Sequence, residues 1–201
     1  ISYRLVGSEM CIRDSCHATG FVGSNGRGTS EHYGIKDGVD ILTGTLGKAL
    51  GGASGGFVCA NKSVVELLKQ KSRPYLFSNA LSPSIVSATM KALEIVESEP
   101  DRRQRIYENS KYFRGEMKKL GFEILGTDHP IVPVMLGDAK VAQHMSKKLL
   151  ENGIYAVGFF YPVVPKNKAR IRLQINSEHT KEELDKVIDT FKKVGEELNL
   201  L

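Results

Sequence analysis

The first half of the chain carries short apolar runs separated by glycine-rich turns. The segment "GVDILTGT" is typical of a buried strand that runs into a turn, and "GGFVCAN" of the next strand. A helix is predicted in "KSVVELLKQKS", where Val64, Leu67 and Leu68 recur at helical spacing. The proline-containing stretch "SRPYLFSNALSP" interrupts it, and another helix is predicted from about Pro83 to Glu97. This order of elements indicates part of an α/β sheet.

The second half combines three helices with four short strands. The first helix has one apolar stripe and ends at Gly121, a suitable C-cap. The stripe consists of Ile106, Phe113, Met117 and Leu120. The strand candidates are "FEIL", "IVPVML", "IYAVGF" and "ARIRLQI", and the second helix is "AKVAQHMSKKLLENG". The last helix, around Thr180 to Leu198, is predicted to bury Leu184, Val187, Ile188, Phe191 and Val194.

The chain is therefore predicted to divide near Pro100. Residues 16–99 resemble strand–turn–strand–helix material of an α/β sheet, and residues 100–201 a smaller α+β domain. The opening, "ISYRLVGSEMCIRDS", shows no clear periodicity, and it lacks the charged and apolar regions of a secretory signal. We expect residues 1–15 to be a non-native leader.

The amino-acid composition argues against several classes of protein. Lys and Arg give a net charge of +5 and a pI near 9.0, but they are scattered among acidic residues and form no basic-and-aromatic strip. We predict no nucleic-acid partner. The longest apolar stretch is glycine-rich and contains a charge, so no membrane span is predicted. Cys11, Cys16 and Cys59 have neither a CxxC spacing nor an even framework, which favours a reducing cytoplasm and predicts no metal site.

Lys48 is the one charged residue in "ILTGTLGKALGGASGGFVCAN". A phosphate-binding P-loop is excluded, because Leu42 and Ala49 occupy positions that require Gly and Ser or Thr. A structural lysine that extends from a strand end is one reading. The other is an amine whose pKa is lowered by an apolar site, so that it attacks a carbonyl group and forms a Schiff base.

Asp14 and His17 stand three residues apart before a glycine-rich loop. A carboxylate can pair with a protonated pyridine nitrogen and an imidazole can donate to a phenolic oxygen, and pyridoxal phosphate presents both groups. Thr45 offers a hydroxyl for a phosphate oxygen. Local capping by Asp14 and turn stabilisation by Thr45 are the alternatives. The pair together with Lys48 favours a pyridoxal phosphate site.

Five blocks, in order, resemble the α-oxoamine synthase family of fold-type-I pyridoxal phosphate enzymes. They are "CHATGFVGSNGRGT", "TGTLGKALGGASGG", "SRPYLFSNALSPSIV", "HPIVPVMLGD" and "GFFYPVVPKNKARIRLQI". The resemblance implies an α/β fold of the aspartate aminotransferase type. Residues 16–99 would form the C-terminal part of its cofactor-binding large domain, and residues 100–201 its small α+β domain. The N-terminal part of the family's large domain has no counterpart here.

The resemblance also implies roles for single residues. Lys48 corresponds to the lysine that binds the cofactor covalently and later moves protons at the substrate α-carbon. Asp14 corresponds to the aspartate that keeps the pyridine nitrogen protonated, His17 to the histidine on the phenolic oxygen, and Thr45 to a phosphate ligand.

Further roles concern the substrate and a second subunit. Ser78 and Asn79 match residues that reach the cofactor phosphate of the neighbouring subunit, which implies a homodimer. Arg172 matches the arginine that binds the substrate carboxylate, a task for which its two-pronged guanidinium is suited.

Within the family, "SRPYLFSNALSP" and "GFFYPVVP" favour a member that interconverts glycine and acetyl-CoA with 2-amino-3-ketobutyrate and CoA, in threonine degradation. The alternatives are a sister enzyme that makes 8-amino-7-oxononanoate, 5-aminolevulinate or a sphingoid ketone, and a non-catalytic binding module. Residues 1–201 alone are expected to be an inactive fragment.

Overall fold

The computed structural model describes residues 11–35, 37–51 and 54–201. The chain forms two compact units: the first ends at Arg103 and the second is Gln104–Leu201. Each unit has its own three-stranded sheet.

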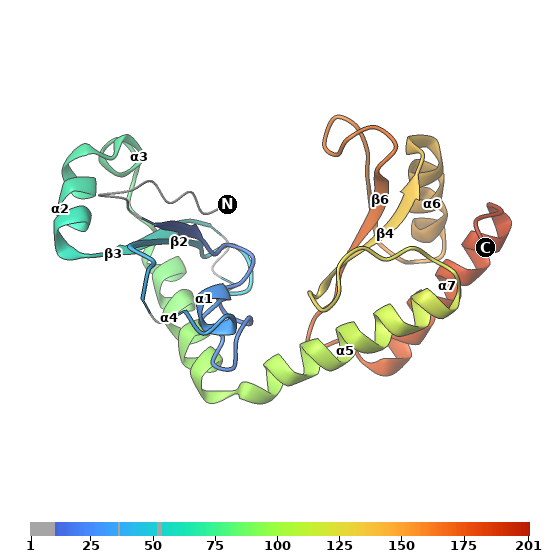
Figure 1. Cartoon of the computed structure of the whole chain (residues 1–201), viewed down its shortest axis with the longest axis horizontal. Helices are drawn as coiled ribbons and strands as arrows, with labels where there is room; N and C mark the ends of the chain where they lie inside the picture. Colours follow the sequence, from blue (N-terminus) through green and yellow to red (C-terminus); the bar gives the residue numbers. More distant parts are fainter. Residues whose placement is uncertain (1–10, 36, 52–53) are drawn as a thin grey trace. The chain divides into compact units, whose positions relative to one another are not determined.

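The sheet of the first unit has the order β1-β2-β3 (Figure 1). β1 (Ile12–Asp14) runs parallel to β2 (Ile41–Thr45), and β3 (Gly56–Ala60) is antiparallel to β2. β2 and β3 correspond to the two predicted strands. β1 was not anticipated, because its three side chains are all exposed and show no alternation. Most of the predicted leader, residues 1–10, lies outside the described residues.

Among the described residues of the first unit, four helices are present. They are α1 (Thr29–His32), α2 (Lys62–Lys71), α3 (Arg73–Leu76) and α4 (Pro83–Ser98). Asn61 caps α2 and Ser82 caps α4, each by accepting a backbone N–H through its side chain. α2 and α4 confirm the predicted helices. α3 was missed, because the sequence signal at Pro74 indicates an interruption, whereas proline also fits the first turn of a helix.

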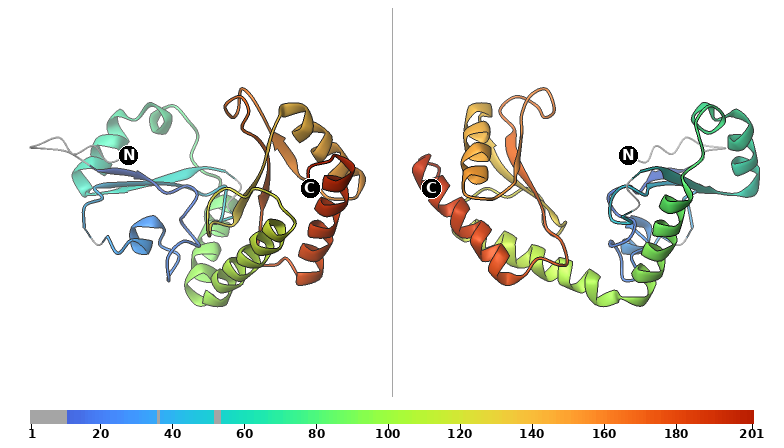
Figure 2. Two further views of the ribbon diagram at one scale, coloured as in Figure 1. Left: turned by 45° about the vertical axis from the view of Figure 1, so that its right-hand side comes forward. Right: turned by 180° about the vertical axis from the view of Figure 1, so that it is seen from behind.

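The second unit has the sheet order β4-β6-β5, with β6 antiparallel to both neighbours. The strands are β4 (Ile131–Gly137), β5 (Val157–Phe159) and β6 (Ala169–Gln174). Helices α6 (Ala139–Glu151) and α7 (Lys181–Glu197) lie on the same side of this sheet (Figures 1 and 2). Helix α5 (Pro100–Lys119) contributes Phe113 and Met117 to the core.

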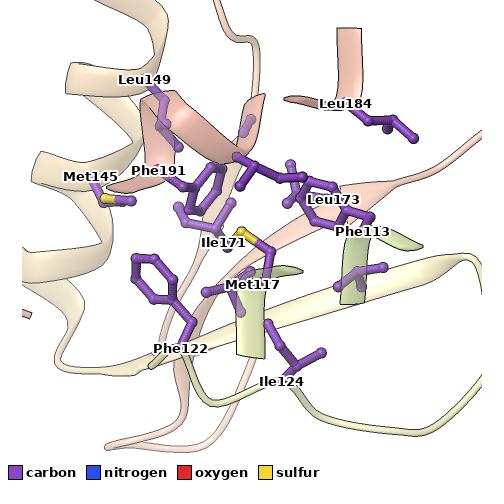
Figure 3. Close-up of a cluster of buried hydrophobic side chains, with 14 of the residues drawn as sticks. Phe113, Met117, Phe122, Ile124, Met145, Leu149, Ile171, Leu173, Leu184 and Phe191 are labelled. Atoms are coloured by element: carbon purple, nitrogen blue, oxygen red, sulfur yellow. The ribbon is translucent and has the colours of Figure 1, made fainter. Parts of the chain in front are cut away.

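One apolar cluster holds the second unit together (Figure 3). Val132 and Val134 of β4 and Ile171 of β6 are fully buried, as are Met145 of α6 and Phe191 of α7. These residues confirm that the alternation in the strands and the stripes on the helices face one core. Gly121 ends α5 with a positive φ of 102°, as predicted, and the Phe122 N–H reaches back to the Met117 carbonyl.

The prediction of four strands in this unit is wrong for "FEIL". That segment makes a single bridge, Ile124 with Val134, and no strand. Buried Arg114 of α5 explains why the following loop leaves the sheet. Its guanidinium donates five hydrogen bonds to the backbone carbonyls of Leu125, Gly126, His129 and Ile131. Carbonyl groups that would otherwise need a neighbouring strand are satisfied by this one side chain.

Candidate active site

The predicted cofactor residues of the first unit gather at one edge of its sheet. β1 and β2 are parallel, so their carboxyl ends meet at the same edge, where ligands bind in α/β sheets. Asp14 is the last residue of β1 and Thr45 the last of β2. His17 and Lys48 follow in the two adjoining turns. The fold thus brings together two segments that are well separated in the sequence, since Asp14 and Thr45 are 31 positions apart.

The turn that carries Lys48 is anchored by leucines on either side. Leu46 is 6% exposed and Leu50 is 2% exposed, whereas Gly47, Lys48 and Ala49 are exposed. Our expectation of an apolar, buried site for the Lys48 amine is therefore wrong within this chain. The two leucines point into the unit, and the short turn between them directs Lys48 outwards.

The loop that follows His17 packs against the Lys48 turn. Gly20 has a positive φ of 103°, and a Cβ atom there would lie 3.2 Å from the Ala49 Cβ and 3.3 Å from a Leu50 methyl group. Only glycine gives both this backbone conformation and this close approach at low cost. The glycine at this position thus lets the buried Gly20 turn lie directly against the Lys48 turn.

Asp14 is held ionised by its surroundings. Its Oδ1 accepts the backbone N–H of Cys16 at 2.8 Å. This bond, then the Cys16 thiol, and to a smaller extent the charges of Lys48 and His17, lower the pKa of Asp14, although some loss of hydration opposes them. The hydrogen bond to Asp14 in turn raises the pKa of the Cys16 thiol. The edge therefore carries a stable carboxylate that is electrostatically coupled to the Lys48 amine.

Thr45 has a structural role in this chain. Its hydroxyl donates to the Gly55 carbonyl at 3.2 Å and accepts the Gly47 N–H at 3.2 Å. These bonds close the turn before Lys48, which is the alternative that the sequence left open. One lone pair of the Thr45 oxygen remains for a ligand.

The glycine-rich loop after His17 is organised by Glu31, a residue that the sequence analysis missed. The Glu31 carboxylate accepts hydrogen bonds from the backbone N–H groups of Asn25 and Arg27 and from the Ser24 and Asn25 side chains. Burial favours a higher pKa, but these donors together lower the pKa of Glu31. The loop in "GSNGRG" thus encloses a carboxylate of its own chain. An acidic residue shortly after a glycine-rich run is the signal that could have suggested it.

Ser78 and Asn79 lie in the exposed segment between α3 and α4. This segment is tied to the sheet edge through Leu81, because a Cβ at Gly55 would lie 2.4 Å from a Leu81 methyl group. Gly55 is also the acceptor of the Thr45 hydroxyl. Leu81 therefore connects the Ser78–Asn79 segment with the turn that precedes Lys48.

Arg172 belongs to the second unit, where it lies half-buried on β6. It lines a cavity of about 590 Å³, together with Val157, Phe159 and Val187. Its guanidinium carbon lies 5.6 Å from the centre of the Phe159 ring. The wall also carries polar side chains, among them Glu183 and Lys186. A guanidinium fork in such a cavity suits a small carboxylate.

Across residues 11–35, 37–51 and 54–201, no cluster of His, Cys, Asp and Glu has the arrangement of a metal site. Within the same ranges no helix is long and apolar enough to span a membrane.

Known proteins resemble this chain along most of its length. It is 54% identical to the 2-amino-3-ketobutyrate coenzyme A ligase of Salmonella typhimurium over 188 residues, which are 94% of this chain and 47% of that protein. It is 46% identical to the 8-amino-7-oxononanoate synthase of Thermosipho melanesiensis over 194 residues, 96% of this chain and 49% of that protein. The chain thus spans about half the length of the curated relatives that it matches.

The solved structure of serine palmitoyltransferase from S. paucimobilis, with bound PLP and myriocin, matches with a TM-score of 0.90 and 31% identity. The match covers 96% of this chain and 48% of that one. Together with the family profile it confirms the predicted α/β fold of type I. The profile of aminotransferase class I and II matches residues 10–191, and the chain belongs to this family.

Proposed function

We propose that the chain is part of a pyridoxal phosphate-dependent glycine C-acetyltransferase. The enzyme would interconvert glycine and acetyl-CoA with 2-amino-3-ketobutyrate and CoA, as in threonine degradation, and would work in the cytoplasm. The observation that carries this proposal is the exposed Lys48 amine at the same sheet edge as the ionised Asp14 carboxylate. The similarity to 2-amino-3-ketobutyrate coenzyme A ligase supports the substrates.

The groups at this edge fit the cofactor. Asp14, whose pKa is lowered, would keep a pyridine nitrogen protonated at neutral pH, and His17 would donate to the phenolic oxygen. No hydrogen bond or ion pair of the Lys48 amine is found among the described residues, so the amine is available to a carbonyl group. Thr45 would add its remaining lone pair by accepting from a protonated phosphate oxygen or an ordered water. When bound, the cofactor supplies an electron sink for carbanion chemistry.

The protein side chains would divide the remaining work. Lys48 would hold the cofactor covalently and then move a proton at the glycine α-carbon. Arg172 would bind the glycine carboxylate through paired N–H groups. Ser78 and Asn79 would contact the cofactor phosphate of a second subunit, which makes the active form a homodimer.

The exposure of Lys48 leads to a further expectation. A covalently bound cofactor must be shielded from hydrolysis by water, and residues 11–35, 37–51 and 54–201 leave Lys48 exposed. We expect residues 1–201 alone to bind pyridoxal phosphate weakly and to be inactive. Full occupancy, measured by the absorbance of the bound cofactor, would contradict this expectation.

The principal test is Lys48→Ala in the complete protein. We expect loss of the covalent adduct that borohydride traps, and loss of turnover by about 1000-fold or more. Lys62→Ala is the matched control, since Lys62 is an exposed lysine at the start of α2. Retained activity in Lys48→Ala would refute the proposal, and absence of any trapped lysine in the unaltered protein would favour a non-catalytic binding module.

A second candidate activity rests on the similarity to 8-amino-7-oxononanoate synthase. A sister enzyme would use the same edge residues but a different acyl thioester. Turnover of acetyl-CoA compared with pimeloyl and succinyl thioesters distinguishes the two. We expect acetyl-CoA to be used with the highest kcat/KM.

A further inference from the structure

Arg172 has an aromatic neighbour on the adjoining strand of its sheet. In the antiparallel pair of β5 and β6, Val157 is opposite Arg172 and Phe159 is opposite Arg170. Side chains two residues apart on a strand point to the same face, so Phe159 is the diagonal neighbour of Arg172. At this diagonal distance an aromatic ring and a long side chain are within reach of each other.

The Arg172 guanidinium lies against the Phe159 ring. The guanidinium carbon lies 5.6 Å from the ring centre, within the range of a cation–π interaction. Among the described residues, no hydrogen bond or ion pair of this guanidinium is found. The ring therefore restricts the position of the cation and leaves its five N–H donors uncommitted.

The position of Phe159 is itself set by close packing. A Cβ atom at Gly158 would lie 3.0 Å from the Ala142 carbonyl oxygen, so β5 passes directly against the backbone of α6. Ala142 is fully buried. Because α6 begins with an Asp138 cap and packs in the core, it gives β5 a fixed support. Phe159 is thus an aromatic residue on a rigidly placed strand.

We propose that Phe159 is a positioning residue, which holds the Arg172 guanidinium so that its free N–H groups face the substrate carboxylate in the cavity. The inference rests on the proposed function, in which Arg172 binds that carboxylate. A side chain with four flexible torsions loses much freedom when it makes two parallel hydrogen bonds. A ring that restricts it beforehand reduces this loss on binding.

This role predicts a particular kinetic signature. Carboxylate binding is made in both the ground state and the transition state, so its loss raises KM with little change in kcat. From the usual strength of a cation–π contact we expect Phe159→Leu to raise the KM for glycine about three- to tenfold. Phe159→Tyr, which keeps an aromatic ring, is expected to retain the KM of the unaltered protein.

The experiment uses the complete protein with Phe159→Leu, Phe159→Tyr and Phe160→Leu. The last is the matched control, because it makes the same change one residue along, beyond the end of β5, whereas the Arg172 guanidinium lies over the Phe159 ring. The KM and kcat for glycine are measured for each variant. Equal KM values for Phe159→Leu and Phe160→Leu would overturn the inference.

A second readout is independent of catalysis. The Phe159 ring shifts the NMR signal of the nearby Arg172 Nε–H through its ring current, and this shift should disappear in Phe159→Leu and persist in Phe159→Tyr. An unchanged signal in Phe159→Leu would contradict the positioning role even if KM rises.

Arg172→Lys tests the carboxylate role of Arg172 separately from the positioning role of Phe159. We expect it to raise the KM for glycine more than Phe159→Leu does, because a point charge lacks the paired donors. If Arg172→Lys leaves KM unchanged, the proposed carboxylate role of Arg172 fails, and the inference fails with it. If Arg172→Lys raises KM and Phe159→Leu does not, the inference about Phe159 alone fails.

Discussion

The two units of the chain differ in how many of their large apolar side chains they bury. In the second unit Phe113, Met117 and Phe191 are fully buried in one cluster. In the first unit Phe77 is 79% exposed and Tyr75 is 65% exposed, and α2 buries no residue at all. The second unit therefore contains the larger core, whereas the proposed cofactor residues lie on a unit with large exposed apolar side chains.

The largest effect on stability is expected from one of two phenylalanine-to-alanine substitutions, one in each unit. We expect Phe191→Ala to lower the free energy of unfolding by about 3–5 kcal/mol, because it removes a fully buried ring and leaves a cavity. Phe77→Ala should change it by less than about 0.5 kcal/mol, since that ring is already in water. Urea unfolding followed by circular dichroism measures both. Equal destabilisation by the two variants would remove the distinction between the units.

A leucine pair tests whether the Lys48 turn is anchored within the first unit. Leu50→Ala is expected to cost about 2–4 kcal/mol, because Leu50 is 2% exposed beneath the turn. Leu67→Ala is the control, with a side chain 58% exposed on α2 and an expected effect below about 1 kcal/mol. Both are measured by urea unfolding. A Leu50→Ala protein as stable as the control would show that the anchor is weak.

The Asp14 carboxyl gives a test by pH. The pKa of Asp14 is lowered in the folded chain, so its ionised form stabilises the fold. This stabilisation is complete above the ordinary pKa of 3.8 and disappears as the pH falls through the lowered pKa. A carbon NMR titration should place the Asp14 midpoint below 3.8, and Cys16→Ala should move it upward by removing the thiol donor. A midpoint at or above 3.8 in the unaltered protein would be inconsistent with the described hydrogen bonds.

The smallest expected effect concerns the Cys16 thiol. Asp14 raises its pKa, so Asp14→Asn should increase the fraction of thiolate and speed alkylation by iodoacetamide at pH 8 about two- to fivefold. Cys59 is exposed on β3 and serves as the internal control, with an unchanged rate. Mass spectrometry of the two labelled peptides gives both rates. A Cys16 rate unaffected by Asp14→Asn would argue against the thiol contact.

The sequence predicts the second unit better than the first for a physical reason. Helices α6 and α7 and strands β4 and β6 bury their periodic positions inside the unit, so local pattern and tertiary packing agree. In the first unit the pattern of α2 has the same form, but no described residues cover it. Hydrophobic periodicity indicates which face of a helix is apolar, but it does not indicate which other segment packs against that face.

At the candidate site the sequence predicts residue types but not their environment. The glycine-rich context of Lys48 suggested a buried amine, and the structure places it in an exposed turn between Leu46 and Leu50. The hydrogen bonds of Thr45 and the enclosure of Glu31 depend on loop geometry that no periodicity encodes. The residue-by-residue roles at this edge remain predictions, which the Lys48→Ala test addresses.

Arg114 has a consequence for how this protein tolerates change. Its hydrogen bonds to the loop of residues 125–131 all go to backbone carbonyls, a group that every amino acid supplies, and the Asp128 carboxylate adds a favourable charge interaction. The side chains of that loop can therefore vary in evolution, or be replaced when a peptide is grafted there, provided that the path of the backbone is kept. Arg114 itself has no such freedom, because no other side chain extends donors to four carbonyl groups at once. One buried arginine thus allows the sequence of the loop at residues 125–131 to vary while its backbone path is kept.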